Sequence, residues 1–310
     1  MTDQALSLVF MGNPDFAVPS FERLHASKHR LLAVVTGTDK RRGRGGEPAP
    51  SPVKQAANSA GVPVLETDNV GSEDVIEHIR ELKPDLLVVV AFKLLPEKVL
   101  AIPAIGSLNL HASLLPKYRG AAPIHHALIN GEQETGCTIF LLDEGMDTGL
   151  ILNQEKTKVD LRDTTGDLYH RLKHSGADLL LKTVNEISRG EHSGKEQDEQ
   201  LATRAPKITP QEARIDFTKD FMTVHNHIRG MSPFPGAWTL FDGKKLIILR
   251  SSPAPGRSLK PGEAVLEEGE VFAGCGAGCV KLEEVKPEGR RKINGAAFLN
   301  GQGGKVQFTI

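Results

Sequence analysis

Three polar side chains in two short segments could together catalyse the transfer of an acyl group. The first segment carries Asn109 and His111, which are separated by one residue. Alternate residues of a β-strand point to the same face, so a strand over 107–112 would project this amide and this imidazole together. The second segment, residues 143–149, reads Asp-Glu-Gly-Met-Asp-Thr-Gly and follows another predicted strand. If that strand runs parallel to its neighbour, it delivers Asp147 to the same edge of the sheet.

This combination suits acyl transfer to an external amine. A histidine can take the proton from the attacking amine, an asparagine can donate a hydrogen bond to the oxyanion, and an aspartate can stabilise the imidazolium. No Ser or Cys stands in a nucleophile-elbow pattern, so an acyl-enzyme is not indicated. From the periodicity alone, a His and an Asn that are merely hydrogen-bonded within the sheet are an equally good interpretation.

The elements that must position these residues alternate along the first 190 residues. Short β-rich runs are separated by segments with helix start and stop signals, which is typical of a parallel sheet covered by helices on both faces. We therefore predict a doubly wound, mostly parallel, Rossmann-like α/β domain over residues 1–189. The first turn has one glycine, Gly12, and then Pro14, so the nucleotide-binding glycines of a dehydrogenase are missing. The strands are expected at 6–12, 30–37, 86–92, 107–112 and 138–143, and the helices at 53–60, at 73–83 and from 164 or 165 onward.

The last third of the chain has a different character. Residues 190–208 are polar and lose hydrophobic periodicity, which indicates a linker. Residues 209–310 contain short β-type runs and frequent glycines, which predict a small β-barrel of the oligonucleotide-binding (OB-like) type. The net charge is +4 over residues 207–310 and −5 over residues 1–206, so the basic part of the chain lies here. The barrel strands are expected at 237–241, 245–249, 263–267, 279–285 and 306–310.

Composition excludes several classes of protein. The longest apolar run, residues 86–92, is far shorter than the roughly 18 residues that cross a bilayer, and no secretion signal precedes it. The 3 cysteines cannot all pair, which fits a reducing compartment, so we expect a cytoplasmic protein. Cys275 and Cys279 have no second pair of matching spacing, so they are expected to be small buried thiols and no metal is expected. No membrane and no obligate protein partner are expected either.

Residues 107–131, together with Met146-Asp147-Thr148-Gly149, closely resemble the formyltransferases that use 10-formyltetrahydrofolate. The resemblance implies that Asn109, His111 and Asp147 are the catalytic Asn, His and Asp of that family. It also implies two folate-contacting segments, one after each of two central strands. The residues concerned are Ser113, Leu114, Leu115 and Pro116 in the first segment, and Val90, Phe92 and Leu95 in the second.

Within that family, the chain is most similar to the members that formylate methionine carried by initiator tRNA. The opening residues 10–16, the insertion at 39–52 and a separate C-terminal β domain support this comparison. The insertion holds four basic residues among glycines, and flexible cations bind phosphate readily. The resemblance implies that this loop enters the acceptor stem of the tRNA. The basic residues are Lys40, Arg41, Arg42 and Arg44, of which the first three depart from the family pattern, where fewer bases and a proline are found.

The implied reaction moves the formyl group of 10-formyltetrahydrofolate to the α-amino group of the methionyl initiator tRNA. The nearest alternative is a formyltransferase for a small amine, such as glycinamide ribonucleotide or an amino sugar. An alternative of another class is a folate- or RNA-binding module without turnover. Formation of formyl-methionyl-tRNA from formylated folate and charged tRNA distinguishes the three.

Overall fold

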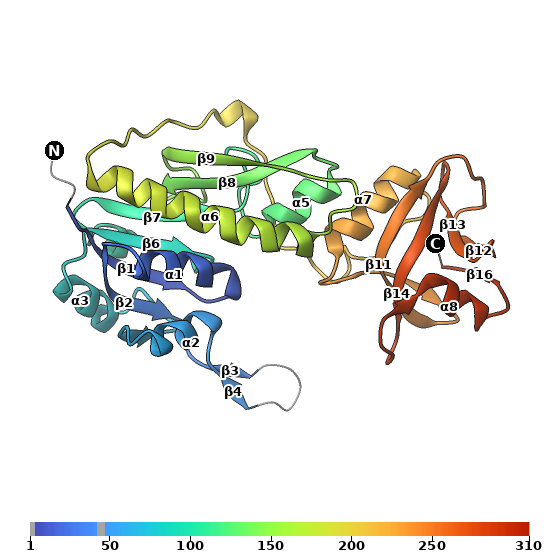
Figure 1. Ribbon diagram of the computed structural model, residues 1–310, viewed down its shortest axis with the longest axis horizontal. Coiled ribbons are helices and arrows are strands. Elements are labelled where there is room, and N and C mark those ends of the chain that lie inside the picture. Colours follow the sequence, from blue (N-terminus) through green and yellow to red (C-terminus); the bar gives the residue numbers. More distant parts are fainter. Residues whose placement is uncertain (1–3, 42–46, 310) are drawn as a thin grey trace. The chain divides into compact units, whose positions relative to one another are not determined.

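A computed structural model describes residues 4–41 and 47–309. The chain divides into two compact units, each with its own sheet (Figure 1). Unit 1 consists of Met1–Gly120, Gly136–Thr157 and His170–Arg204. Unit 2 consists of Ala121–Thr135, Lys158–Tyr169 and Ala205–Ile310.

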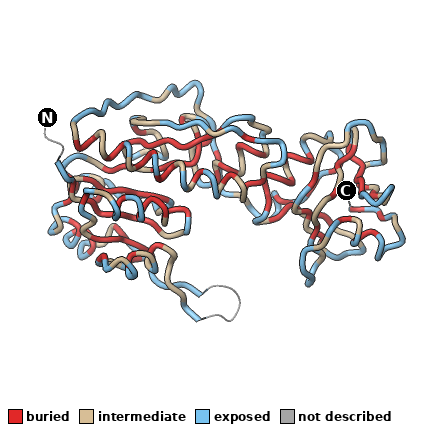
Figure 2. The backbone as a smooth tube through the Cα atoms, viewed as in Figure 1, coloured by how far each residue is buried: buried red, intermediate tan, exposed pale blue. Residues whose placement is uncertain are grey.

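The sheet of unit 1 has seven strands in the order β5-β2-β1-β6-β7-β8-β9. The neighbours from β5 to β7 are parallel, whereas β8 is antiparallel to β7. Figure 2 shows that the central strands are buried along their length, as their apolar sequences require. The strands are β1 (Ser7–Gly12), β2 (Arg30–Thr36), β5 (Val64–Glu66), β6 (Leu86–Val90), β7 (Gly106–His111), β8 (Glu134–Leu141) and β9 (Ile151–Lys158).

Helices cover both faces of this sheet. Phe21 of α1 packs edge-on against Phe10 of β1 on one face, with ring centroids 5.9 Å apart. On the other face, apolar residues of α3 and α4 form a core cluster with alternate residues of β1 and β6. Helix α2 begins with Pro52 after the N-cap Ser51, whose hydroxyl accepts a hydrogen bond from the backbone of Lys54. The helices are α1 (Val18–His25), α2 (Pro52–Ser59), α3 (Glu73–Glu81), α4 (Glu97–Leu100) and α6 (Thr165–Ser188), with 3-10 turns at Asp15–Ala17 and Glu199–Leu201.

The parallel strands of unit 1 end at a common edge. Gly12 at the end of β1 lies beside Val90 at the end of β6, and Val90 lies beside Leu110 of β7. The segments that follow these strands therefore leave the sheet at the same edge, where open α/β sheets bind their ligands. A short hairpin, β3 (Lys40–Arg41) and β4 (Pro48–Ala49), stands between β2 and α2 (Figure 1).

The sheet of unit 2 is antiparallel and curls towards closure. Its strands follow the order β10-β11-β14-β13-β12-β16, and β15 pairs with β14. The N–H of Thr309, just after β16, donates to the carbonyl of Leu240 in β10, so the two ends of the strand path meet. The strands are β10 (Ala237–Phe241), β11 (Lys244–Ala254), β12 (Glu263–Glu267), β13 (Glu270–Gly274), β14 (Cys279–Pro287), β15 (Ile293–Asn294) and β16 (Lys305–Gln307), accompanied by α5 (Pro123–Ile129), α7 (Phe221–Met231) and α8 (Gly295–Asn300).

The core of unit 2 lies inside this curled sheet. Val224 and Ile228 of α7 pack with strand residues such as Ile248, and the rings of Phe217 and Phe308 stack 5.6 Å apart. The predicted fold class, a mostly parallel α/β sheet followed by a small β domain, is thus confirmed. None of the helices that the structure describes is long and apolar enough to cross a membrane.

Candidate active site

The imidazole of His111 lies at the carboxyl end of β7 with only 8% of its side chain exposed. Its Nε2 atom is 2.8 Å from the carbonyl oxygen of Tyr118. A carbonyl oxygen can only accept a hydrogen bond, so Nε2 carries the hydrogen and the neutral ring keeps its lone pair on Nδ1. His111 therefore presents Nδ1 as its basic atom.

The carboxylate of Asp147 faces that basic atom. Its Oδ2 lies 3.6 Å from His111 Nδ1, which is within ion-pair range but too long for a hydrogen bond. The same oxygen accepts a hydrogen bond of 2.8 Å from the backbone N–H of Gly120. A proton that arrives on Nδ1 thus meets a negative charge whose place is fixed by the backbone.

Asp147 reaches the site by a different route from the predicted one. His111 lies opposite Thr138 and Leu108 opposite Leu141, so β8 is antiparallel to β7 and the expected parallel strand is wrong. The connection from β7 to β8 starts and ends at the same edge of the sheet, so the returning strand must run in the opposite direction. The carboxylate is delivered instead by the loop of residues 142–150, which joins β8 to β9.

The 142–150 loop is held by contacts of its own residues. Asp143 Oδ1 accepts hydrogen bonds from the N–H of Gly145 and from the hydroxyl of Thr148, at 3.0 and 2.7 Å. Gly149 passes so close to β8 that an added Cβ atom would lie 1.7 Å from the carbonyl oxygen of Leu141. Only glycine fits there, which explains why the Asp-Thr-Gly triplet ends in glycine.

Asn109 shares a face of β7 with His111, as predicted. It lies opposite Val89 of β6 and Phe140 of β8, and its side chain is partly exposed. Leu110 points the other way and packs against α6, where an added Cβ on Gly176 would be 2.9 Å from it. Strand alternation therefore leaves the amide of Asn109 and the imidazole of His111 on the side opposite α6.

The Ser113–Pro116 segment follows β7 directly and is tied to the sheet through its backbone. The hydroxyl of Thr138 donates to the carbonyl of Ser113 at 2.7 Å and accepts from the N–H of Leu115 at 3.1 Å. The amide of Gln154 donates to the carbonyl of Leu115 at 2.8 Å. Ser113 and Leu115 are buried, whereas Leu114 and Pro116 are partly exposed and can contact a ligand.

The segment after β6 lies beside this one because β6 and β7 are neighbours. Val90 is buried at the end of the strand, and Leu95 is buried in the core cluster with α3 and α4. Phe92 is partly exposed and packs against the same cluster. Ala91 between them has a φ of 49°, in the left-handed region, so the chain turns sharply at the sheet edge.

Two cavities of unit 1 lie near these segments. One, of about 380 Å³, is lined by residues 141–143, 148–150 and 196–197, so it borders the loop of Asp147 without including Asn109 or His111. The other, of about 310 Å³, is lined by residues that follow β1, β2 and β6, among them Asn13, Thr38 and Lys93. Both have dimensions suited to parts of a small-molecule ligand.

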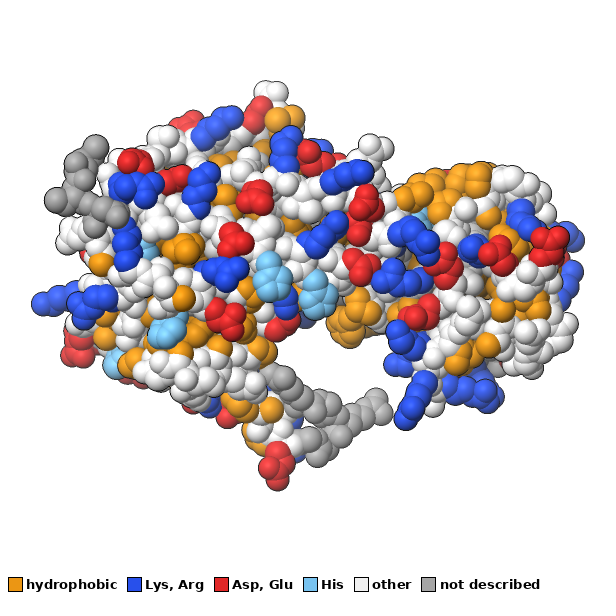
Figure 3. All heavy atoms as spheres, viewed as in Figure 1, with side chains coloured by type: hydrophobic (Ala, Val, Ile, Leu, Met, Phe, Trp, Pro, Cys, Tyr) orange, Lys and Arg blue, Asp and Glu red, His pale blue; other side chains and the backbone are white. Residues whose placement is uncertain are grey.

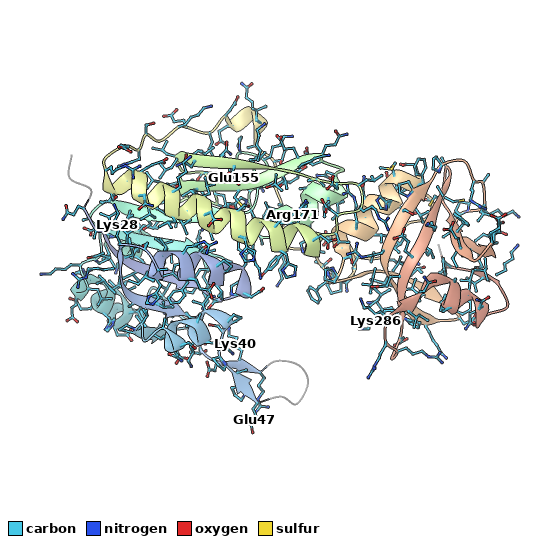
Figure 4. All side chains as sticks on the ribbon, viewed as in Figure 1. Lys28, Lys40, Glu47, Glu155, Arg171 and Lys286 are labelled. Carbon is cyan, nitrogen blue, oxygen red and sulfur yellow. The ribbon has the colours of Figure 1, made fainter. Side chains whose placement is uncertain are left out.

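The predicted basic residues fall in the β3–β4 hairpin and in the residues between its strands. Lys40 and Arg41 form β3 and are exposed, and Figure 4 shows Lys40 at the base of the hairpin. Arg42 and Arg44 lie outside the described residues. The hairpin base is anchored because Lys54 of α2 forms ion pairs of 2.7 Å with both Asp39 and Glu66.

Several residues with a place in this site were not predicted as functional. The backbone of Tyr118 and Gly120 holds the His–Asp pair, and Thr138 holds the segment after β7. Gln197 contacts the backbone of the Asp147 loop from residues 190–208, the segment predicted to be a linker. Tyr118 and Gly120 lie within the family-like motif, but nothing in the local pattern around Gln197 indicates its partners.

The thiols form no disulfide and no metal site in the part of the chain that the structure describes. All three cysteines are free and buried, which confirms the prediction for Cys275 and Cys279, and burial raises the pKa of Cys137 and of Cys275 to about 12. Over residues 4–41 and 47–309, no group of three or more His, Cys, Asp or Glu side chains is arranged to hold a metal ion.

Comparison with known proteins gives consistent matches over nearly the whole chain. The formyl transferase family model matches residues 6–184, and the model of the formyl transferase C-terminal domain matches residues 207–303. A methionyl-tRNA formyltransferase of Halothermothrix orenii is 41% identical over 306 residues, covering 96% of this chain and 97% of the relative. One of Geobacter metallireducens is 42% identical over 299 residues, covering 96% of each.

Solved structures share the fold at lower identity. An N-formyltransferase of Helicobacter canadensis, in complex with folinic acid and dTDP-3-aminofucose, superposes with a TM-score of 0.70 at 21% identity, covering 93% of this chain and all (100%) of that one. HypX of Aquifex aeolicus, in complex with tetrahydrofolic acid, superposes with a TM-score of 0.66 at 18% identity, covering 96% of this chain and 47% of that one.

Proposed function

The chain belongs to the formyl transferase family, in its methionyl-tRNA formyltransferase branch, and we propose that it transfers the formyl group of 10-formyltetrahydrofolate to the α-amino group of methionyl initiator tRNA. The observation that carries the mechanism is the approach of Asp147 to Nδ1 of His111, beside Asn109 on the same strand face. In this proposal, catalysis belongs to residues 1–189 and tRNA binding extends over 209–310, with 190–208 as the connection.

His111 is the general base of the proposed reaction. The methionyl nitrogen forms a bond to the formyl carbon while the carbonyl electrons move to oxygen, and Nδ1 of His111 takes a proton from the amine. Collapse of the intermediate reforms the carbonyl and breaks the bond to N10 of the folate, which leaves with the proton that His111 took from the amine. An α-amino group has a pKa of about 7.7 to 8.0, so roughly a tenth to a sixth of it is already unprotonated at pH 7 and only modest basicity is needed.

Asp147 and Asn109 stabilise the two charges that appear. The carboxylate of Asp147 interacts with the imidazolium and keeps the ring oriented, and its own position is held by the N–H of Gly120. The amide of Asn109 donates a hydrogen bond to the oxyanion, a contribution typically worth about 100- to 1,000-fold in rate. No metal takes part in this proposal.

The proposed folate site combines the segments after β6 and β7. Its contacts are Val90, Phe92 and Leu95 from the first segment and Ser113, Leu114, Leu115 and Pro116 from the second. Support comes from their placement, since both segments leave the sheet at the edge where His111 lies. The backbone fixed by Thr138 supplies a rigid wall for a flat ring.

The proposed tRNA contacts are cationic and lie in both units. In unit 1 they are Lys40, Arg41, Arg42 and Arg44, which would reach the acceptor stem. In unit 2, Figure 3 shows lysine and arginine side chains gathered near β14, where Figure 4 labels Lys286. Lys244, Lys245 and Arg290 line a cavity of the same unit. We propose a cytoplasmic location, since a charged tRNA substrate and free buried thiols are both typical of that compartment.

The deciding experiment mixes the purified protein with 10-formyltetrahydrofolate and methionyl initiator tRNA and looks for formyl-methionyl-tRNA. Glycinamide ribonucleotide and a nucleotide-linked amino sugar serve as competing acceptors in parallel reactions. Transfer to a small amine but not to the tRNA would replace the proposed substrate. Binding of both substrates without transfer to any acceptor would leave a binding module.

A further inference from the structure

Residues 195–204 lie along the loop of Asp147 and are hydrogen-bonded to the rest of unit 1 at both ends. Lys195 and Ile151 exchange two backbone hydrogen bonds, of 2.9 and 2.8 Å. At the other end, the N–H of Arg119 donates to the carbonyl of Thr203 at 2.9 Å, and the hydroxyl of Thr203 accepts from the N–H of Tyr118 at 2.8 Å. This part of the predicted linker therefore has a defined position against the catalytic residues.

Gln197 in this segment uses all of its hydrogen-bonding capacity. Its Nε2 atom donates to the carbonyl of Asp147 at 2.9 Å and to the carbonyl of Gly149 at 2.8 Å. Its Oε1 atom accepts from Nε and from a terminal nitrogen of Arg119, at 3.1 and 2.8 Å. A carboxamide has two N–H donors and two acceptor lone pairs, and here every one has a partner.

Arg119 connects Gln197 to the stretch of backbone that holds the His111–Asp147 pair. It follows Tyr118, whose carbonyl fixes the His111 ring, and precedes Gly120, whose N–H holds Asp147. The guanidinium also pairs with Glu199, with one N···O distance of 2.7 Å, and its side chain is 10% exposed against 70% for Glu199. The arginine is thus nearly enclosed, and the glutamate supplies its countercharge from the surface.

We propose that Gln197 is a positioning residue for the formyl transfer: it joins the backbone of the Asp147 loop to Arg119 and so holds Asp147 at its distance from His111. Gln197, Arg119 and the carbonyls of Asp147 and Gly149 form what we term the Gln197 clamp. The inference rests on the proposed function, because it presumes that the His111–Asp147 pair does the chemistry. The clamp itself touches neither the formyl group nor the amine.

The test compares variants of the full-length protein in steady-state formylation of methionyl initiator tRNA. Gln197→Ala is expected to lower kcat by about 10- to 100-fold, since displacing a catalytic group by about 1 Å can cost about 100-fold. The KM values for both substrates should change by less than about threefold, because the clamp contacts neither substrate. Gln200→Ala, at an exposed position of the same segment, is the matched control and should keep wild-type kcat.

Gln197→Glu tests whether a loss of kcat can be separated from a loss of folding. The glutamate has the same size and can still pair with Arg119, but its carboxylate cannot donate to the carbonyls of Asp147 and Gly149. We expect the same selective loss of kcat with a melting temperature close to wild type. Wild-type kcat in both Gln197 variants would overturn the clamp, and so would a loss confined to KM.

A double-mutant cycle shows whether Gln197 acts through Asp147. In an Asp147→Ala background, Gln197→Ala should lower kcat no further, because the group that it positions is already missing. An undiminished second loss would overturn the inference, since it would mean an independent structural role. Asp147→Ala with full turnover would reject the proposed mechanism itself, whereas an impaired Asp147→Ala beside a normal Gln197→Ala would reject only the clamp.

Discussion

The Nε2 atom of His111 lies 2.8 Å from the carbonyl oxygen of Tyr118, and this contact decides which ring nitrogen is free for chemistry. Because the carbonyl oxygen accepts a hydrogen bond from Nε2–H, the lone pair of the neutral ring is on Nδ1, on the side of Asp147. Both nitrogens of the ring thus have separate tasks, one structural and one chemical.

Replacement of this base should affect the chemical step most. His111→Ala is expected to lower kcat by about 100- to 10,000-fold, the usual contribution of a general base, with the dissociation constant for folate nearly unchanged. Single-turnover formylation and folate titration measure the two effects separately. Turnover within a few-fold of wild type would show that another group accepts the proton.

Loss of the oxyanion donor should also spare folding. Asn109→Ala is expected to reduce kcat by about 100- to 1,000-fold. The residue is only partly buried, so thermal unfolding should change little. Near-normal turnover of a folded Asn109→Ala protein would contradict its assignment.

The basic loop should act on tRNA and not on folate. Arg44→Ala is expected to weaken use of charged tRNA and to reduce the slope of log affinity against log salt concentration by about 1, as expected for one lost phosphate contact. Lys98→Ala, which removes an exposed lysine paired with Glu73, is the control and should leave that slope unchanged. Equal damage to folate and tRNA use would reject the role of the loop.

Gly149 should not tolerate a side chain. In Gly149→Ala the new Cβ would meet the carbonyl oxygen of Leu141 at 1.7 Å, so β8 and the loop of Asp147 must separate. We expect the free energy of unfolding to fall by about 1 to 3 kcal/mol or more, together with a loss of kcat. Gly256→Ala, where nothing lies within 4 Å of the new atom, is the control for urea unfolding and turnover.

Histidines of unit 2 should make the protein sensitive to mild acid. Burial lowers the pKa of His125, His225 and His227 below the ordinary value of 6.5. At His225 the neutral ring is fully used, since Nε2 donates to the carbonyl of Leu161 and Nδ1 accepts from the hydroxyl of Ser251. Below pH 6.5 the unfolded chain binds protons that the folded one does not, so this stability is present above pH 6.5 and is lost as the pH falls.

Urea unfolding at a series of pH values measures the acid effect. Each such histidine should contribute a slope of about 1.4 kcal/mol per pH unit while it is neutral in the fold and charged when unfolded. His227→Leu should flatten the dependence, and the exposed His78→Gln should not. A stability that is constant from pH 7.5 to 5.5 would contradict the prediction.

The sequence predicted the elements whose residues carry a local signal. The apolar run 86–92 contains β6, and the alternating runs 237–241 and 263–267 coincide with β10 and β12. β9 was missed because Ile151–Lys158 is largely polar, as an edge strand with one exposed side can be. The direction of β8 could not be predicted either, because it depends on where the preceding connection returns to the sheet.

In the candidate site, too, some residues could be predicted from the local sequence and others could not. Asn109 and His111 lie on one strand, so their shared face follows from a period of two. Asp147 was placed by its motif, and its approach to His111 is a tertiary contact. Gln197 has partners at 119, 147 and 149, far from it in the chain, and a polar segment has no periodicity that could reveal them. Hydrogen bonds between residues so far apart in the chain form only in the folded structure, so the local sequence does not predict them.

The hydrogen bond from Thr309 to Leu240 has a consequence for the handling of this protein. It covers one part of the outer edge of β10, and the backbone of Ala213 and Ile215 covers another part through hydrogen bonds with Trp238. Proteolytic trimming at Thr309 would uncover the part of that edge at Leu240 and offer its backbone groups to a neighbouring molecule for strand addition. The last few described residues therefore protect the protein against aggregation as well as completing its fold.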